Sequence, residues 1–435
     1  MVRFSYFPAL IFLLFLPLIF LFFPASPALS AEVLHITVAG VINPVSAEFI
    51  GKAVKEAEET NAAALLIELD TPGGLDTSMR SIVKDIGASR VPVIVFVSPR
   101  GARAASAGVF ITMSAHVAAM APGTNIGAAH PVSVGGKMDN VTSEKATNDA
   151  AAYIKTIAKQ SGRNAKWAED SVRNSVSVTE SEALKLNVVD IVADDVPSLL
   201  DEIDGRKVTT AAGNMTLKTA NARMTKREMG FRSKVLDLIS NPNVAYILML
   251  LGFYGLFFEL TNPGVVAPGV IGAICLILAF YSFQTLPVNY AGMLLILVGI
   301  ILFILEVKVT SYGMLTVGGV FCLVLGSMML FDSPLPFFKV SLSLILPTAI
   351  ITALFFMLTF RLAYKAYKTK PVTGQEGLVG LEGTAKTNIT AHDGMIMVHG
   401  ELWSAYSDER IAKDESVIIT EVKGLKVKVR KTPIG

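Results

Sequence analysis

The chain has 435 residues, enough for two or three domains, and a net charge of only +2. Its hydrophobic content of 52% lies above the average of soluble proteins, and its charged content of 17% lies below it. This near-neutral charge gives no support to a nucleic-acid partner. The two cysteines allow no disulfide framework, the five histidines form no metal-binding cluster and no phosphate-binding loop occurs, so we expect no cofactor.

The first segment, residues 1–31, is predicted to direct export. One early positive charge, Arg3, precedes an apolar run from about Phe7 to Phe23, and small residues follow as far as Ala31. This order is typical of a signal peptide, although the run is long enough to stay as an N-terminal anchor. In either case, the segment after it is expected on the outer side of the membrane.

Residues 32–204 are predicted to form one α/β domain. Strand-like runs alternate with helical stretches, and several strands are apolar on both faces, as in a sheet covered by helices on each side. The predicted strands are His35–Val38, Ala64–Asp70, Pro92–Val97, Val117–Met120 and Val188–Val192, and the clearest predicted helices are Ala47–Thr60 and Asp76–Ile86. Residues 205–240 are expected to form a basic linker to the membrane.

Residues 241–362 are predicted to form a transmembrane domain of about five helices. The apolar segments are Val244–Phe258, Val265–Phe283, Val288–Leu305, Met314–Phe331 and Val340–Phe360. A span needs about 20 apolar residues, so the first segment is marginal. Five spans that start outside end inside, and the basic cluster after Phe360 agrees with a cytoplasmic exit. The basic residues before the first span disagree, but long domains translocate largely regardless of charge.

Residues 371–435 form the tail, which is polar, punctuated by glycine and strand-like. Val417–Ile419 and Leu425–Val429 flank a turn at Lys423-Gly424, and Met395–Val398 leads into Gly400-Glu-Leu-Trp403. Short strands of this kind are typical of a five-stranded β-barrel.

A serine in the α/β domain is a candidate nucleophile. Ser106 lies in Gly101-Ala-Arg-Ala-Ala-Ser106-Ala-Gly108, between a predicted strand and a helix that continues to about Ala115. Backbone N–H groups and the positive end of the helix dipole point at such a position. The small neighbours of Ser106 would let a substrate backbone approach. The alternative is a serine that caps the helix in a tightly packed turn.

A glycine pair closes the strand Ala64–Leu69, in Asp70-Thr-Pro-Gly73-Gly74. It can be a flexible turn whose entry is set by Pro72. Alternatively, its backbone N–H groups and that of Ala107 form an oxyanion hole, in which losing one donor typically costs about 3 kcal/mol of transition-state stabilisation.

A serine hydroxyl needs a base at neutral pH, and two residues qualify. One is His130, because a histidine side chain in general titrates near neutrality without help. Lys145, which opens the helical stretch Lys145–Ser161, has to lose about 3 pKa units by desolvation before it can accept a proton. Each has a simpler interpretation: His130 as a loop histidine that hydrogen-bonds the backbone, and Lys145 as a solvated lysine at a helix start.

These motifs resemble the NfeD family of membrane-bound serine peptidases, which is related to the ClpP and crotonase fold group. The resemblance extends over most of the chain. It is carried by Asp70–Asp76, Ala105–Gly108, Ala119–His130, Gly162–Asn164, Asn241–Asn243, Glu259–Gly264, Thr373–Gly380 and Gly400–Trp403.

The resemblance implies a ClpP/crotonase-like α/β domain, an all-α transmembrane bundle and an OB-like barrel. It implies an ATP-independent serine endopeptidase in which Ser106 is the nucleophile, Lys145 the base, and Gly73 or Gly74 with Ala107 the oxyanion donors. His130 stays the alternative base, because ClpP-like relatives use a histidine at a similar distance after the serine.

From the resemblance and the sequence, we also have expectations about the substrate, the assembly and the location. An extended substrate would pair along Gly73–Thr77 and Gly123–Ala128. The expected partners are stomatin-like or flotillin-like membrane proteins, cleaved at apolar sequence, and membrane lipid. At least a homodimer is expected, in the cell membrane, with the peptidase domain outside and the barrel in the cytoplasm.

Three other functions have to be weighed. The chain could be a non-catalytic scaffold that organises stomatin-like or flotillin-like partners. It could be a crotonase-like enzyme acting on thioesters, although the sequence shows no adenine-nucleotide site. It could be a transporter, although Glu259, Glu306 and Lys308 lie at span ends, whereas an ion pathway needs charges at mid-membrane.

Overall fold

The structure is a computed structural model that describes residues 31–133, 138–261, 264–309, 311, 313–368 and 375–432. The predicted export segment lies outside the described residues except for Ala31. The chain divides into two compact units: residues 1–296 with 324–346, and residues 297–323 with 347–435.

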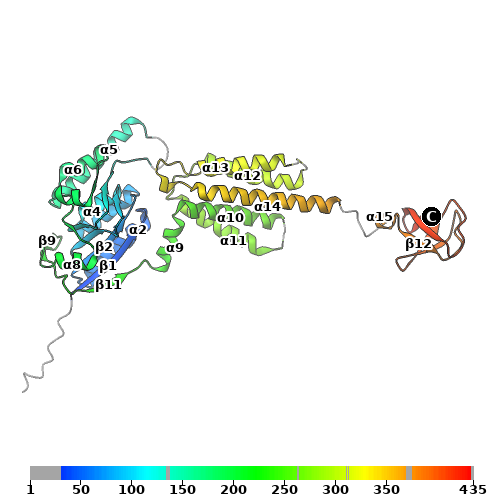
Figure 1. Cartoon of the computed structure of the whole chain (residues 1–435), viewed down its shortest axis with the longest axis horizontal. Coiled ribbons are helices and arrows are strands. Elements are labelled where there is room, and N and C mark those ends of the chain that lie inside the picture. The colour runs from blue at the N-terminus through cyan, green and yellow to red at the C-terminus, as the bar shows by residue number, and fades with distance from the viewer. Residues whose placement is uncertain are drawn as a thin grey trace, which may run out of the picture. The chain divides into compact units, whose positions relative to one another are not determined.

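The first unit is built around a six-stranded sheet (Figure 1). Its order is β11-β1-β2-β3-β5-β8, and every neighbouring pair is parallel. The strands are β1 (Glu32–Ala39), β2 (Ala64–Asp70), β3 (Val93–Val97), β5 (Val117–Met120), β8 (Ile191–Val192) and β11 (Arg223–Arg227). Strand β8 is shorter than the predicted Val188–Val192 because the N–H groups of Val188 and Val189 donate to the Ala183 carbonyl in the helix that precedes it.

Both faces of this sheet are buried, as predicted. In β2, Leu65, Ile67 and Leu69 belong to one core cluster, whereas Ala64 and Leu66 belong to the other. Each fully buried aliphatic side chain contributes about 1.5–3 kcal/mol. The helices of this domain are α2 (Pro44–Glu59), α3 (Asp76–Ala88), α4 (Ala107–Ser114), α5 (Asn140–Gln160), α6 (Ala165–Arg173), α7 (Glu180–Lys185) and α8 (Val196–Glu202).

The predicted linker, residues 205–240, is ordered structure. It forms the hairpin of β9 (Lys207–Thr210) and β10 (Gly213–Thr216), then β11, then α9 (Phe231–Ile239). Strand β11 pairs with β1 from Glu32↔Arg223 to Ile36↔Arg227. Most of its side chains are exposed, as in an edge strand, and its polar, basic composition therefore indicated a linker.

Five apolar helices follow: α10 (Pro242–Thr261), α11 (Val266–Phe283), α12 (Tyr290–Lys308), α13 (Met314–Met329) and α14 (Leu342–Lys368). Within the described residues, three segments are long and apolar enough to cross a membrane: Pro242–Leu260, Val266–Phe283 and Pro336–Thr359. The first segment, expected to be marginal, is long enough because its helix extends past the apolar run at both ends, and it is the least apolar of the three. The shorter apolar helices are Tyr290–Glu306 and Met314–Met329.

Glycine lets α10 and α11 approach closely. A Cβ added to Gly272 would lie 2.8 Å from Leu256 N and 2.9 Å from Gly252 O, and one added to Gly255 would lie 2.5 Å from Pro268 O. In a membrane no hydrophobic effect drives helices together, so small residues that let the backbones pack closely stabilise the contact. This packing is typical of helices inside a membrane.

The second unit contains a helical part and a barrel. Gly299 of α12 meets Gly319 of α13, and the ring of Phe303 stacks on Phe356 of α14 with 4.9 Å between centroids. The Glu306 carboxylate, in a residue only 1% exposed, accepts the N–H groups of Gly313 and Thr316 at 3.0 and 2.9 Å. It therefore caps the start of α13.

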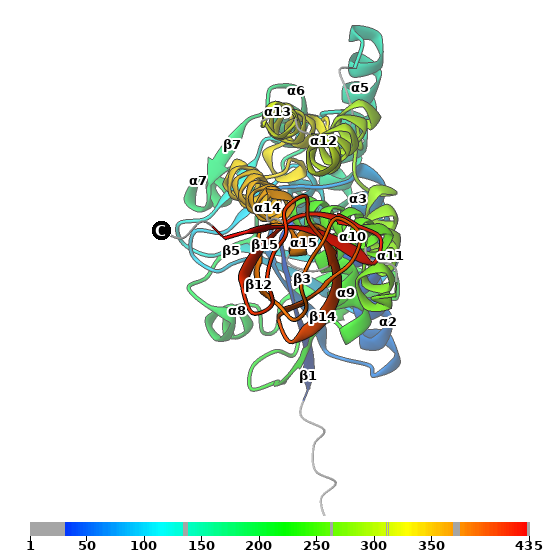
Figure 2. The same ribbon diagram turned by 90° about the vertical axis from the view of Figure 1, so that its right-hand side faces the viewer.

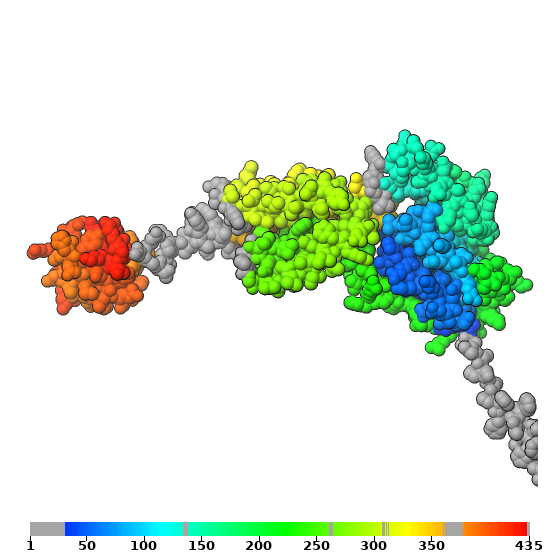
Figure 3. Space-filling model, turned by 180° about the vertical axis from the view of Figure 1, so that it is seen from behind, coloured from blue at the N-terminus to red at the C-terminus, as the bar shows by residue number. Residues whose placement is uncertain are grey.

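The tail closes into the predicted five-stranded barrel, which Figure 3 shows as a compact orange-to-red body. Its order is β12-β13-β14-β16-β15, with β14 and β16 parallel and the other pairs antiparallel. This is a small OB-like barrel. The strands are β12 (Glu382–Ala385), β13 (Met395–Val398), β14 (Glu401–Tyr406), β15 (Ser416–Lys423) and β16 (Lys426–Lys431), after the short helix α15 (Gln375–Leu378).

Candidate active site

Ser106 lies on a sharp turn between strand β4 (Arg103–Ala105) and helix α4. Its backbone has φ 53° and ψ −111°, and its side chain makes no capping hydrogen bond although it occupies the N-cap position. The capping interpretation of this serine therefore fails. A non-glycine residue at positive φ costs about 1–2 kcal/mol, so the surrounding structure has to hold it there.

A small second sheet holds this turn. Strand β4 is parallel to β6 (Asn125–Gly127), which is antiparallel to β7 (Ser177–Thr179). The N–H of Ser106 donates to the Gly127 carbonyl at 3.0 Å. On the other side of β4, Thr71 bridges Ala104, and the Asp70 carboxylate accepts the Arg103 N–H at 3.0 Å. The segment after β2 and the serine turn are thus joined by backbone pairing.

Gly73 lies directly against Ser106. A Cβ on Gly73 would be 2.7 Å from Ser106 Cβ and 3.2 Å from Ser106 Oγ, and Gly73 has φ +118°. Only glycine fits both the conformation and the space. The structure therefore brings together the two motifs that the sequence singled out.

Two of the three predicted oxyanion donors are free. The Gly73 N–H donates to Thr71 Oγ1 at 3.0 Å, and the Gly73 carbonyl accepts the Ile42 N–H at 2.8 Å. Because the N–H and C=O of a trans peptide point in opposite directions, the Gly74 N–H points away from Ile42. Across the described part of the chain, the N–H groups of Gly74 and Ala107 have no hydrogen-bond partner.

The small residues around Ser106 serve packing. A Cβ on Gly108 would lie 2.7 Å from Thr71 Cγ2 and 3.3 Å from Ala104 Cβ. Ala104 and Ala107 are 0% and 4% exposed. They let the first turn of α4 lie close to the segment that carries Gly73, and this packing explains why the residues around Ser106 are small.

Lys145 is not at Ser106 in this structure. The helix begins at Asn140, capped by Asp139, so Lys145 sits in its second turn and does not open it. Its side chain is exposed, and no contact joins it to Ser106. The buried residues of α5 begin only at Ala150, and Figure 2 shows the end of this helix projecting from the domain.

His130 makes the backbone contact that its simpler interpretation predicts. Its Nδ1 donates to the Val172 carbonyl at 2.9 Å, which leaves Nε2 as the unprotonated nitrogen of the neutral ring. The ring lines a pocket of about 610 Å³ with Met138 and Ser143, and Ser106 is not among the lining residues. Among the described residues, no cluster of His, Cys, Asp or Glu is suited to a metal ion.

The far end of α4 is fixed by Arg163, a residue to which the sequence analysis gave no role. Its guanidinium donates to the Met113 and Ala115 carbonyls, both at 2.8 Å, and pairs with Asp190. Burial, together with the charge of Arg163, lowers the pKa of the neighbouring His116 to about 4. The only sequence signal for Arg163 was its place in the Gly-Arg-Asn motif.

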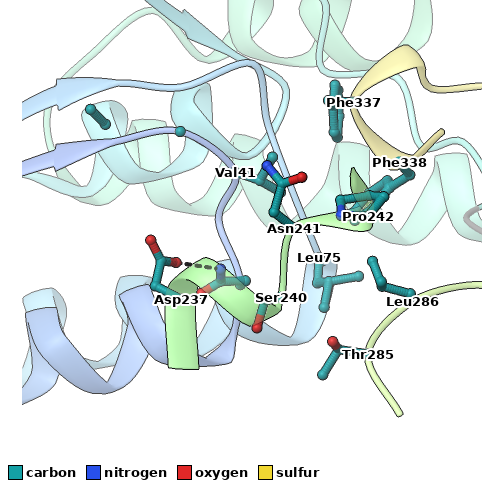
Figure 4. Close-up of a pocket in the computed structure, with 13 residues that line it drawn as sticks. Val41, Leu75, Asp237, Ser240, Asn241, Pro242, Thr285, Leu286, Phe337 and Phe338 are labelled. Atoms are coloured by element: carbon teal, nitrogen blue, oxygen red, sulfur yellow. Dashed lines mark hydrogen bonds between the residues drawn. The ribbon is translucent and has the colours of Figure 1, made fainter. Parts of the chain in front are cut away.

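A pocket of about 220 Å³ opens beside Leu75, the residue after Gly74 (Figure 4). On one side, Asn43 Nδ2 donates to Asp237 Oδ1 of α9 at 2.8 Å. The other wall comes from the ends of the apolar helices and the 3₁₀ helix η1 (Pro336–Phe338): Pro242, Thr285, Leu286, Phe337 and Phe338. Apolar side chains thus lie next to Leu75, the residue that follows the free Gly74 N–H.

Comparison with known proteins matches all three parts of the chain. Residues 32–199 match the NfeD1b N-terminal domain, residues 243–362 the NfeD integral membrane domain, and residues 375–431 the NfeD-like C-terminal, partner-binding domain.

Two relatives match over most of their length. The membrane-bound protease PH1510 of Pyrococcus horikoshii is 37% identical over 424 residues, which is 94% of this chain and 96% of the relative. The membrane protein NfeD1b of Bacillus subtilis is 27% identical over 404 residues, 88% of this chain and 89% of the relative. A solved structure, a lysine-to-alanine mutant of the 1510-N membrane-bound stomatin-specific protease with a substrate peptide, is 36% identical, with a TM-score of 0.45 and coverage of 48% of this chain and 98% of that one.

A parallel sheet with a small second sheet that presents a serine at a strand-to-helix turn defines a ClpP-like serine peptidase domain. Here it precedes a membrane domain and an OB-like barrel. The chain belongs to the NfeD family, as its sequence motifs indicated.

Proposed function

We propose that this chain is an ATP-independent membrane endopeptidase in which Ser106 is the nucleophile and Lys145 the general base. Ser106 Oγ attacks a peptide carbonyl while the neutral amine of Lys145 takes its proton and then passes it to the leaving amine. Water then hydrolyses the acyl-enzyme. One observation carries the proposal: Ser106 has a strained backbone, makes no side-chain capping hydrogen bond and contacts Gly73. Two free N–H groups, those of Gly74 and Ala107, lie in the neighbouring backbone.

The Gly74 and Ala107 N–H groups are the proposed oxyanion hole. Gly74 is held by its backbone bridge to Ile42, and Ala107 begins α4, so neither N–H needs to rearrange as negative charge develops. Gly73 has a different part in this proposal: its N–H is occupied by Thr71, and its missing side chain makes room for Ser106.

The dyad requires the projecting turn of α5 to approach Ser106 when substrate binds or chains assemble. The relative solved with a substrate peptide carries a lysine-to-alanine mutation, which supports a lysine in the chemistry. His130 stays the alternative base, with Nε2 as its acceptor. We also propose at least a homodimer, which light scattering of the protein in detergent would test.

The proposed substrate is an apolar stretch of a stomatin-like or flotillin-like membrane protein. A relative is described as stomatin-specific, and the pocket beside Leu75 offers apolar walls where an extended chain would pass. An engineered cavity of about 150 Å³ holds benzene, so about 220 Å³ is room for one large apolar side chain.

We propose that the peptidase domain lies outside the membrane and the barrel in the cytoplasm. The described residues hold three candidate spans and five apolar helices, and an odd number of crossings in either case supports opposite sides for the two ends of the membrane domain. Protease accessibility of the barrel in intact and opened cells would test this.

Turnover of an apolar peptide by the full chain in detergent tests the enzyme. Ser106→Ala should abolish turnover, and Lys145→Ala should do so without loss of folding. The rate of labelling by a fluorophosphonate should rise with an apparent pKa above about 8 for lysine, and near about 6.5 if His130 is the base. Equal turnover by wild type and Ser106→Ala would defeat the proposal.

A scaffold is the second candidate, because the tail matches a partner-binding domain. A scaffold would retain its partner in pull-down experiments with Ser106→Ala and show no serine-dependent hydrolysis.

A further inference from the structure

Three helices that lead away from the site meet at Arg80 of α3. Its Nε donates to Asp76 Oδ2 at 2.8 Å, and a terminal nitrogen pairs with Asp149 of α5. Its guanidinium also lies 4.4 Å from the centre of the Tyr153 ring, which stacks on Phe110 of α4 with 6.0 Å between centroids. Arg80 therefore joins the helix that follows Gly74, the helix that follows Ser106 and the helix that carries Lys145.

Asp149 lies one turn after Lys145 on the same face of α5. Side chains four residues apart on a helix are neighbours, with about 5–6 Å between Cβ atoms. Asp149 is turned toward α3, and Arg80 reaches back to Asp76, the first residue of α3. The face that bears Lys145 is thus directed toward the N-terminal end of α3.

The anchoring of α5 stops one turn after Lys145. Arg173 of α6 donates to Asn148 Oδ1 at 2.7 Å, and Arg80 holds Asp149. Before these two residues the helix has no buried side chain. Asn148 and Asp149 are therefore the last fixed points from which the lysine-bearing turn extends.

The charges around this face are Glu144 and Asp149 on α5, Asp76 and Arg80 on α3, and Glu169 and Arg173 on α6. Asp149 forms its ion pair with Arg80. An unpaired carboxylate within about 4–6 Å stabilises an ammonium group, so it would oppose deprotonation of Lys145. Arg80, which also pairs with Asp76, offsets part of that charge.

We infer that Arg80 is a positioning residue for Lys145, which fixes the last anchored turn of α5 and offsets the charge of the Asp149 carboxylate beside the base. This inference rests on the proposed Ser106–Lys145 dyad. It assigns to Arg80 both a mechanical and an electrostatic effect, and the two can be separated by substitution.

The experiment measures kcat/KM against pH for the full chain in detergent. In Arg80→Ala, the exposed Asp149 charge should raise the apparent pKa of the base by about one unit and lower kcat/KM at pH 7 about tenfold. Arg80→Ala combined with Asp149→Asn should return the apparent pKa to the wild-type value. Arg80→Lys, which keeps the charge, should not raise it.

Arg173→Ala is the matched control. It cuts the tether to Asn148, a neutral residue, and Glu169 keeps Lys155 at 2.7 Å, so no carboxylate is left unpaired. This variant should lose rate through the loosened helix without any change of apparent pKa. Asp149→Asn alone removes a carboxylate and keeps the Arg80 charge, so it should lower the apparent pKa and never raise it.

Two results overturn the inference: an unchanged apparent pKa in Arg80→Ala, or a raised one that persists in the double variant. Lys145→Ala separates this from the proposed function. If it turns over substrate as the wild type does, the dyad and the inference fail together. If it is inactive and Arg80→Ala leaves the apparent pKa unchanged, only the inference fails.

Discussion

Replacing Gly73 by alanine tests the contact on which the site depends. The added Cβ would lie 2.7 Å from Ser106 Cβ, whereas carbon atoms rest about 3.5–4.0 Å apart, so the two atoms have to separate by about 1 Å. A misplacement of about 1 Å at a reacting group can cost about 100-fold in rate, or about 2.7 kcal/mol. We expect this loss in kcat/KM and in the rate of fluorophosphonate labelling.

Gly101→Ala is the control, because Gly101 also has a positive φ, +87°, but nothing lies within 4 Å of its added Cβ. Both variants should lose about 1–2 kcal/mol of stability from the backbone conformation, measured by unfolding in detergent. Only Gly73→Ala should lose the nucleophile geometry. A Gly73→Ala enzyme as fast as Gly101→Ala would refute the reasoning.

Three other parts of the structure give tests. Thr285→Trp fills the pocket beside Leu75, so kcat/KM should fall about tenfold for peptides with large apolar residues, at unchanged fluorophosphonate labelling; equal slowing of all peptides would contradict this. His116→Asn keeps an acceptor for the Val93 N–H but cannot titrate. Because the pKa of His116 falls from 6.5 to about 4 on folding, its stability contribution is full above pH 6.5 and is lost on acidification. The wild type should therefore lose about 2 kcal/mol more than the variant between pH 7 and pH 5, in guanidinium unfolding followed by Trp167 fluorescence in a Trp403→Phe background; equal losses would exclude this effect. Glu306→Leu leaves two N–H groups of α13 without their acceptor and should cost about 2–4 kcal/mol in thermal unfolding, more than Glu306→Gln, which keeps one oxygen; the reverse order would argue against the cap.

The layered sheet could be predicted because its strands are apolar at almost every position. A run such as Val93–Val97 can be buried along its whole length only by a sheet covered on both faces. The barrel could also be predicted, from its short strands and glycine turns. Strand β11 was missed because a mostly exposed edge strand carries no alternation of apolar and polar residues.

The candidate site was predicted in its parts and not in its geometry. Ser106 and Gly73 lie far apart in the chain, and their contact depends on the β-bridge between Thr71 and Ala104. No local sequence pattern predicts this bridge. The proposal of Gly74 and not Gly73 as an oxyanion donor depends on which way one peptide unit faces. The start of α5 was misplaced because the polar residues before Lys145 have no apolar periodicity, and Asp139 sets the boundary through its cap.

Strand β11 decides where the peptidase domain can be cut from the rest of the chain. A fragment that stops at residue 204 keeps β1 but loses the partner of its outer edge. Residues 32–36 would then expose unpaired backbone groups, which invite pairing with another molecule. A well-behaved soluble fragment has to run through Arg227, so the catalytic half of the protein is finished only when the chain has almost reached its first membrane helix.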